Sequence, residues 1–132
     1  MDKLGLSQKA IIFNKDKFLV IKRGDTASSN PNKWDFPGGY VDFGEDPYDS
    51  IKREIEEEAG LKIDVLEPYE VHSRITHDKN HWITIAYKCR TENKDIKLSY
   101  EHSEYKWVNI EEFNKLDAVD KIVMFANKAY DK

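Results

Sequence analysis

The chain has 132 residues, of which 39% are hydrophobic and 35% charged, and its formal net charge is -4. This length predicts one domain, residues 1–132, around a single hydrophobic core. The charge balance argues against a partner such as DNA or RNA, whose binding proteins usually carry a basic stripe, but it leaves a phosphate-bearing small molecule open.

Location and oligomeric state are only loosely bounded. No window approaches the roughly 20 apolar residues that span a bilayer, and the first residues lack the apolar stretch of a secretion signal. We therefore expect a cytoplasmic protein without a membrane partner, and a dimer stays open. Cys89 is the only cysteine, so no intramolecular disulfide can form. A buried thiol is expected there, with a reactive thiol as the alternative.

The first half of the chain predicts a hairpin, a loop and a helix. Two apolar runs within residues 7–22 flank a polar turn at 14–17, as in a β-hairpin. Residues 24–33 are polar and predict a loop. Asp46 can cap a helix whose first residue is Pro47, and Gly60 is typical of a helix end. We therefore predict a helix over residues 47–59.

The second half predicts strands and two further helices. Residues 68–76 and 81–91 are expected strands joined by a turn at 77–80, and 105–108 is a short strand. Asn109 and Glu112 resemble the capping box of a short helix. A last helix is expected over 118–130, with one apolar face formed by Val119, Ile122, Val123, Ala126 and Tyr130. This order predicts an α+β fold with a mixed sheet, not a doubly wound one.

The helix at 47–59 concentrates carboxylates on one side. At 3.6 residues per turn, Glu54, Glu57 and Glu58 fall within an arc of about 100°. Such a face is either a solvated acidic surface or a site for hard cations such as Mg²⁺, which prefer oxygen ligands. The remaining positions form an apolar stripe that can dock on a sheet (Tyr48, Ile51, Ile55 and Ala59) and a solvent-facing side (Asp49, Lys52 and Glu56).

Two glycines precede this helix in the segment WDFPGG, residues 34–39. They permit a positive φ or a close approach of backbone to a ligand. A backbone carbonyl at this bend could join the helix carboxylates around a metal, and a plain turn is the alternative. Neither a GxGxxG phosphate loop nor a Walker lysine is present in the sequence.

Together these residues resemble the Nudix box, since every defined position of that pattern is filled across residues 39–61. The segment at 34–38 is similar to the MutT-like subgroup, which hydrolyses nucleoside triphosphates. The resemblance implies an α/β/α sandwich around a mixed β-sheet and a hydrolase that uses Mg²⁺ or Mn²⁺. The matching residues are Gly39, Glu45, Arg53, Glu54, Ile55, Glu57, Glu58, Gly60 and Leu61.

The resemblance also implies roles for individual residues. Glu54, Glu57 and Glu58 would hold the divalent metals, with the Gly38 carbonyl as a backbone ligand. We expect the oxygens of these three glutamates to converge closely enough to share cations. Arg53 would orient carboxylates beside Glu57 and Glu45.

A further acid often precedes a later tryptophan in this family. Glu101 lies six residues before Trp107 and fits that spacing, and Glu104 is the alternative. The general base is expected in the pool of Glu54, Glu57, Glu58 and Glu101.

Substrate contacts are less constrained by the sequence. Trp34 and Phe36 could stack on a base, as could Tyr40 and Trp82, although aromatic side chains at strand positions are also typical of a core. Arg23, beside Lys22, could contact phosphates or simply be solvated. The spacing of His72, His77 and His81 indicates no zinc site.

We therefore predict cleavage of the pyrophosphate linkage of a nucleoside triphosphate, giving a nucleoside monophosphate and pyrophosphate. Hydrolysis of ADP-ribose or of a dinucleoside polyphosphate is the alternative within the family. Some subgroups with those substrates carry a proline or tyrosine in the window that is here 76–79, which has neither. A non-catalytic nucleotide- or metal-binding module is the alternative of another class. Degenerate members usually lose box glutamates, and this chain retains them.

Overall fold

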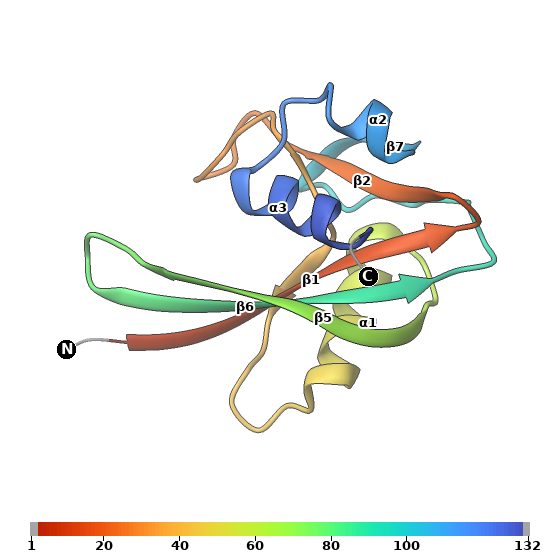
Figure 1. Cartoon of the computed structure of the whole chain (residues 1–132). Helices are drawn as coiled ribbons and strands as arrows, with labels where there is room; N and C mark the ends of the chain where they lie inside the picture. The colour runs from red at the N-terminus through yellow and green to blue at the C-terminus, as the bar shows by residue number, and fades with distance from the viewer. Residues whose placement is uncertain (1–2, 131–132) are drawn as a thin grey trace.

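A computed structural model describes residues 3–130, which form a seven-stranded mixed sheet with helices on both faces (Figure 1). The strands are β1 (Lys3–Asn14), β2 (Lys17–Arg23), β3 (Trp34–Asp35), β4 (Gly38–Tyr40), β5 (Asp64–Ile75), β6 (Asn80–Arg90) and β7 (His102–Val108). The helices are α1 (Pro47–Ala59), α2 (Ile110–Phe113) and α3 (Asp120–Lys128). Among these residues, no helix is both long and apolar enough to cross a bilayer.

The sheet is mixed because β1 pairs in parallel with β6 and antiparallel with its neighbours on the other side. Its strand order is β3-β2-β1-β6-β5, with β4 paired to β1 and β7 to β2. The predicted hairpin forms only beside its turn, where Phe13 pairs with Phe18. Further along β1, β4 takes the place of β2, and β2 pairs instead with β3 and β7. This exchange of partners brings residues 38–40 alongside β1.

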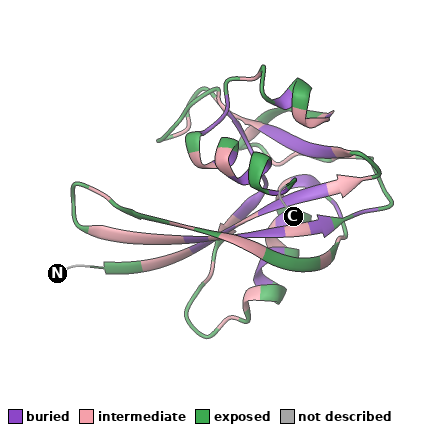
Figure 2. Ribbon diagram, in the orientation of Figure 1, coloured by how far each residue is buried: buried purple, intermediate pink, exposed green. Residues whose placement is uncertain are grey.

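Two apolar clusters cover the two faces of the sheet. On one face, Ile51, Ile55 and Ala59 of α1 are fully buried against β1, β2 and β6. On the other face, α2 and α3 pack on a cluster that contains Phe18 and Phe125. Figure 2 shows the resulting buried band through the middle of the strands. The predicted α/β/α sandwich with a mixed sheet is confirmed.

Local signals placed most helix ends correctly. The Asp46 carboxylate accepts hydrogen bonds from the backbone of residues 48 and 49, and Gly60 ends α1 in the left-handed conformation with φ 68°. The capping box of Asn109 and Glu112 is present. However, α3 is shorter than the predicted 118–130. Its inner face is Ile122, Phe125 and Ala126, while Val123, which we expected on that face, is exposed. Tyr130 lies beyond the end of α3 and is half-exposed, but its ring packs on Phe13 and Phe18 as an inner-face residue would.

The segment at 34–39 is not the bend that we predicted, because it forms the short strands β3 and β4. Neither Gly38 nor Gly39 has a positive φ. Their lack of a side chain serves close packing: a Cβ at Gly38 would overlap the carbonyl oxygen of Gln8, and one at Gly39 would lie 2.5 Å from the carboxyl carbon of Glu54. The glycines thus let β4 fit between β1 and α1.

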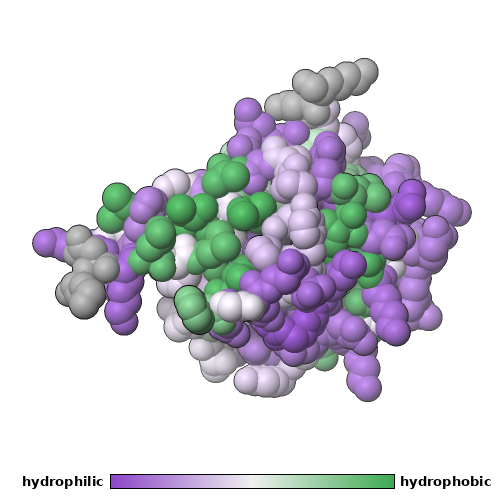
Figure 3. Space-filling view, turned by 90° about the horizontal axis from the view of Figure 1, so that it is seen from below, coloured by the Kyte–Doolittle hydropathy of each residue, from purple (hydrophilic) through white to green (hydrophobic). Residues whose placement is uncertain are grey.

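One end of the sheet extends beyond the helices. There β1, β5 and β6 project past α1 and α3 (Figure 1). The strand register places Leu4 and Ile75 in one row and Val71 in another on the face that α1 covers elsewhere, and all three are exposed. Figure 3, viewed from the α1 side, shows hydrophobic side chains gathered at this end.

Cys89 lies on the covered part of the same face and is fully buried. Burial raises the pKa of its thiol to about 12. The alternative of a reactive thiol is therefore excluded at neutral pH, because the thiolate is the reactive form.

Candidate active site

A cleft of about 510 Å³ opens where α1, β1 and β4 meet. We call it the acidic cleft, since it is lined by Glu54, Glu57, Glu58 and Glu101. The first three come from α1, and Glu101 comes from the turn before β7. Residues far apart in the sequence are thus brought to one cavity, as the predicted site requires.

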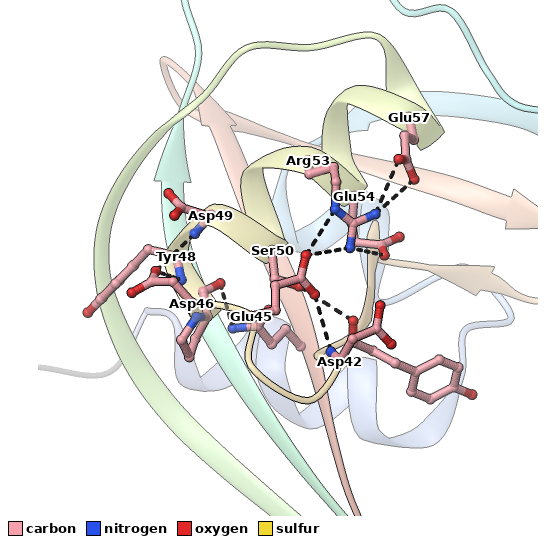
Figure 4. A network of polar contacts seen from close by, with 12 residues as sticks. Asp42, Glu45, Asp46, Tyr48, Asp49, Ser50, Arg53, Glu54 and Glu57 are labelled. Atoms are coloured by element: carbon pink, nitrogen blue, oxygen red, sulfur yellow. Dashed lines mark hydrogen bonds and ion pairs between the residues drawn. The ribbon is translucent and has the colours of Figure 1, made fainter.

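Arg53 connects the acids along this face of α1 (Figure 4). Its guanidinium donates to Glu45 at 3.0 and 2.8 Å and to Glu57 at 3.2 Å, and it forms an ion pair with Glu54 at 3.1 Å. Hydrogen bonds to Glu45 and Glu57 raise the Arg53 pKa above its ordinary value. The predicted contacts of Arg53 with Glu45 and Glu57 are confirmed. Three carboxylates are thus held around one guanidinium group.

Glu58 is the most enclosed acid of the cleft, with a side chain only 16% exposed. One oxygen accepts a hydrogen bond from the Gly38 N–H at 3.3 Å, and the other lies 3.8 Å from Nε2 of His102. Burial raises the Glu58 pKa to about 8, although the Lys9 charge opposes this shift. Burial also raises the pKa of Glu54, whose carboxylate Arg53 partly stabilises.

The glutamates share a cleft without forming a ready-made metal cluster. Within residues 3–130, no three acidic, histidine or cysteine side chains gather closely enough to hold a metal ion. The expectation that the oxygens of Glu54, Glu57 and Glu58 already converge is therefore wrong for this conformation. The physical reason is that protein donors, Arg53 and the Gly38 N–H, draw the carboxylates toward themselves.

The donor set nevertheless fits a hard divalent cation. All of the acids offer carboxylate oxygens, the ligands that Mg²⁺ and Mn²⁺ prefer. The raised pKa values of Glu54 and Glu58 show that their negative charge is incompletely compensated by the protein. A cation bound among them would supply the missing compensation.

Cations also line the acidic cleft. Asp35, which is 2% exposed, accepts a hydrogen bond from Lys9 at 3.0 Å and one from Arg23 at 3.2 Å. Burial opposes ionisation of Asp35, but Lys9 and further donors lower its pKa overall. Lys121 of α3 lines the cleft as well. A polyanion in the cleft would therefore meet cations as well as acids.

The two rival acids before Trp107 lie in different places. Glu101 lines the acidic cleft, and its backbone carbonyl accepts a hydrogen bond from Gly24. Glu104 instead points along the β2–β7 pair, where it forms an ion pair with Lys22 at 3.3 Å. Position therefore favours Glu101, while its catalytic role stays a prediction.

The structure corrects two substrate-binding predictions. Phe36 is 1% exposed and packs edge-to-face on Phe18 within the core. Trp34 is 6% exposed, and Lys22 and Lys106 lie over its ring. Neither the Trp34 indole nor the Phe36 ring exposes a face to a nucleobase, because both side chains are buried in the core. Arg23 does line the acidic cleft, as a phosphate contact requires.

Sequence reasoning missed several side chains of this site. Lys9, Asp35 and Lys121 come from separate elements, and nothing in their local sequence marks them. His102 had one available signal, its position next to Glu101. Burial lowers its pKa, and its Nδ1 is buried without a hydrogen-bond partner among the described residues.

Known proteins place this site in a family. A family model described as the NUDIX domain matches residues 3–127. The nucleoside triphosphatase NudI of Enterobacter sp. (strain 638) is 28% identical over 117 residues, covering 81% of this chain and 83% of that protein. NudI of Salmonella arizonae (strain ATCC BAA-731 / CDC346-86 / RSK2980) is 29% identical with the same coverage.

Solved structures agree with the sequence relatives. The MutT protein from Methanosarcina mazei Go1 superimposes with a TM-score of 0.83 at 26% identity, covering 99% of this chain and 98% of that one. The MutT NUDIX hydrolase from Burkholderia pseudomallei shares the fold with a TM-score of 0.81 at 21% identity, covering 96% and 98% of the two chains. With its box residues and carboxylate cleft in place, the chain belongs to the Nudix family of hydrolases.

Proposed function

We propose that this chain, acting as one Nudix domain, hydrolyses the pyrophosphate linkage of a nucleoside triphosphate to a nucleoside monophosphate and pyrophosphate. The observation that carries the proposal is the acidic cleft, which four glutamates line together with Lys9, Arg23 and Lys121. The names of the NudI relatives, nucleoside triphosphatases, support the substrate class. Nudix hydrolases generally need a divalent metal ion, and we propose Mg²⁺ or Mn²⁺.

Glu54, Glu57, Glu58 and the Gly38 carbonyl would hold the metal. When bound, a divalent cation neutralises phosphate charge and lowers the pKa of a coordinated water. Arg53 keeps Glu54 and Glu57 in place by its hydrogen bonds and ion pair.

The remaining groups orient the substrate and accept a proton. Lys9, Arg23 and Lys121, which line the cleft, offset the negative charge of the phosphates. Water adds to phosphorus, the bridging P–O bond breaks, and a carboxylate of Glu54, Glu57, Glu58 or Glu101 takes the proton that water releases.

A substrate panel tests the proposal. Nucleoside triphosphates, ADP-ribose and dinucleoside polyphosphates are incubated with Mg²⁺ or Mn²⁺, with EDTA as the control, and the products are separated by chromatography. We expect pyrophosphate and monophosphate from triphosphates, and none with EDTA. Ribose phosphate from ADP-ribose alone would reassign the substrate, and nucleotide binding without cleavage would leave a non-catalytic module.

Replacing Glu57 by glutamine tests the metal-binding role. The side chain is 59% exposed and contacts Arg53, so Glu57→Gln should leave the thermal midpoint unchanged. We expect kcat to fall by roughly 100-fold or more, because a charged ligand is lost from the cleft. Glu56→Gln is the matched control, since Glu56 lies one residue away on the exposed side of α1. Near-normal turnover of Glu57→Gln would refute the assignment.

A further inference from the structure

A second cavity, of about 670 Å³, adjoins the acidic cleft on the side of β5 and β6. We call it the aromatic pocket, because Tyr40 and Trp82 line it. Its volume is within the range of small-molecule sites. A ligand with its phosphates in the acidic cleft can extend into this pocket, since both cavities are lined by Ser7, Ser29, Asn30, Tyr40, Val119 and Lys121.

The floor of the aromatic pocket is an aromatic surface on the sheet. Trp82 of β6 pairs with Gly5 of β1, and a Cβ at Gly5 would overlap the Trp82 ring. The glycine therefore lets the indole lie across β1 toward Tyr40, whose ring centroid is 4.9 Å away at 39°. Tyr40 is 62% exposed, and Trp82 is half-buried. Such a surface suits stacking by a planar ring.

Two cations beside this floor have no partner among the residues that the structure describes. Arg74 lies on β5 directly opposite Trp82, and Lys121 lies at the start of α3. Within residues 3–130, neither side chain forms a hydrogen bond or ion pair in the structure. Burial and the charge of Lys9 lower the Lys121 pKa to about 8, as expected for an uncompensated ammonium group. Both side chains can only donate hydrogen bonds, so a ligand with acceptor atoms would complement them. Asp120 also lines the pocket and is its one acidic group among the described residues.

A third cavity could instead hold the part of a ligand that extends beyond its phosphates. It has a volume of about 720 Å³, lies beside residues 24–28, and shares Arg23 and Glu101 with the acidic cleft. Its aromatic lining is Tyr100, which is 96% exposed, and the imidazole of His102. Its cation Arg23 is already bound to Asp35 and to the Ser29 carbonyl. The aromatic pocket is therefore better suited than this cavity to bind a planar ring with acceptor atoms.

We propose that the aromatic pocket binds the nucleobase of the substrate, stacked on Trp82 and Tyr40, and that Arg74 and Lys121 donate hydrogen bonds to its carbonyl oxygens. The pocket thereby selects guanine and the pyrimidines over adenine, which has no carbonyl oxygen. This inference rests on the proposed function for the placement of the phosphates, but the pocket can be tested without hydrolysis.

Binding of nucleoside monophosphates with Mg²⁺ provides that test, since they lack the linkage that would be cleaved. Calorimetry compares GMP and UMP with AMP on the full chain. We expect GMP and UMP to bind at least about tenfold more tightly than AMP, the effect of hydrogen bonds to charged donors. Arg74→Gln should remove most of this preference without unfolding the chain, because Arg74 is exposed.

Stacking is tested by a matched pair of aromatic variants. Trp82→Leu should weaken binding of all monophosphates by at least about fivefold. Trp82→Phe, which keeps an aromatic ring, should retain part of the affinity that Trp82→Leu loses. Tyr100→Leu, in the rival cavity, should leave affinity unchanged. Circular dichroism shows whether Trp82→Leu folds, and Arg74→Gln tests the pocket if it does not.

The outcomes separate this inference from the proposed function. Equal affinities for GMP, UMP and AMP would overturn the base pocket even if triphosphates are hydrolysed. The same holds if Tyr100→Leu weakens monophosphate binding and Arg74→Gln leaves it unchanged. Selective binding that depends on Arg74, without triphosphate hydrolysis, would support the pocket and refute the proposed reaction.

Discussion

At the scale of single residues, the acidic cleft holds charges that the protein alone does not fully stabilise. Glu58 is the clearest case, because it is enclosed and has one hydrogen bond from Gly38. Its pKa of about 8 lies above the ordinary value of 4.5. The folded state therefore binds a proton between these pH values that the unfolded state releases, so this group makes folding less favourable as pH rises through that window.

Glu58→Gln should remove this pH-dependent cost. In metal-free buffer, we expect the stability of the variant relative to wild type to rise by about 2 kcal/mol between pH 6 and pH 8. Thermal unfolding at both pH values measures the difference. Glu56→Gln, an exposed neighbour, should show no such trend. A gain that does not grow with pH would contradict the cause assigned to Glu58. Magnesium should stabilise wild type more than Glu58→Gln.

At the scale of elements, the site depends on how closely β4 fits between β1 and α1. The two glycines of β4 face different neighbours: Gly38 faces the backbone of Gln8, and Gly39 faces the side chain of Glu54. Backbone cannot move without disturbing the β1–β4 pair, whereas a glutamate side chain can adopt another rotamer. The same substitution at the two positions should therefore affect different properties.

Gly38→Ala should mainly reduce stability, by roughly 2 kcal/mol or more, because the Cβ overlaps the carbonyl oxygen of Gln8. Gly39→Ala should mainly reduce kcat, by about tenfold or more, because it displaces the Glu54 carboxylate. Guanidinium unfolding and steady-state hydrolysis measured on both variants separate the two effects. Equal losses of stability in the two variants would argue against this division.

At the scale of the whole molecule, one sheet joins two apolar clusters. The clusters under α1 and under α3 both include residues of β1, β2 and β6. Loss of packing on the α3 face should therefore destabilise the strands that also support α1 and its glutamates. We expect the two faces to unfold together.

Phe125→Ala tests this coupling. Phe125 is fully buried in α3, so its truncation should cost about 3–5 kcal/mol. Val123→Ala is the matched control on the same helix, where Val123 is 38% exposed and the cost should stay below about 1 kcal/mol. Tryptophan fluorescence and far-UV circular dichroism should follow one transition in guanidinium. Separate transitions would show that the faces unfold independently.

The sequence by itself determined those parts of the fold and of the site that depend on residues close together in the chain. The ends of α1, the capping box at Asn109 and the shared face of Glu54, Glu57 and Glu58 follow from hydrogen bonds and periodicity within a few residues. The filled box positions also identified the family, which the match over residues 3–127 confirms.

Only the tertiary structure decided those parts of the fold and of the site that depend on segments far apart in the chain. The exchange of β2 for β4 beside β1 turned an expected bend into a strand, and it placed Phe36 in the core. It also brought Lys9 to Asp35 and both to the cleft. Strand pairing is set by long-range contacts, whereas local sequence signals extend over about one helical turn.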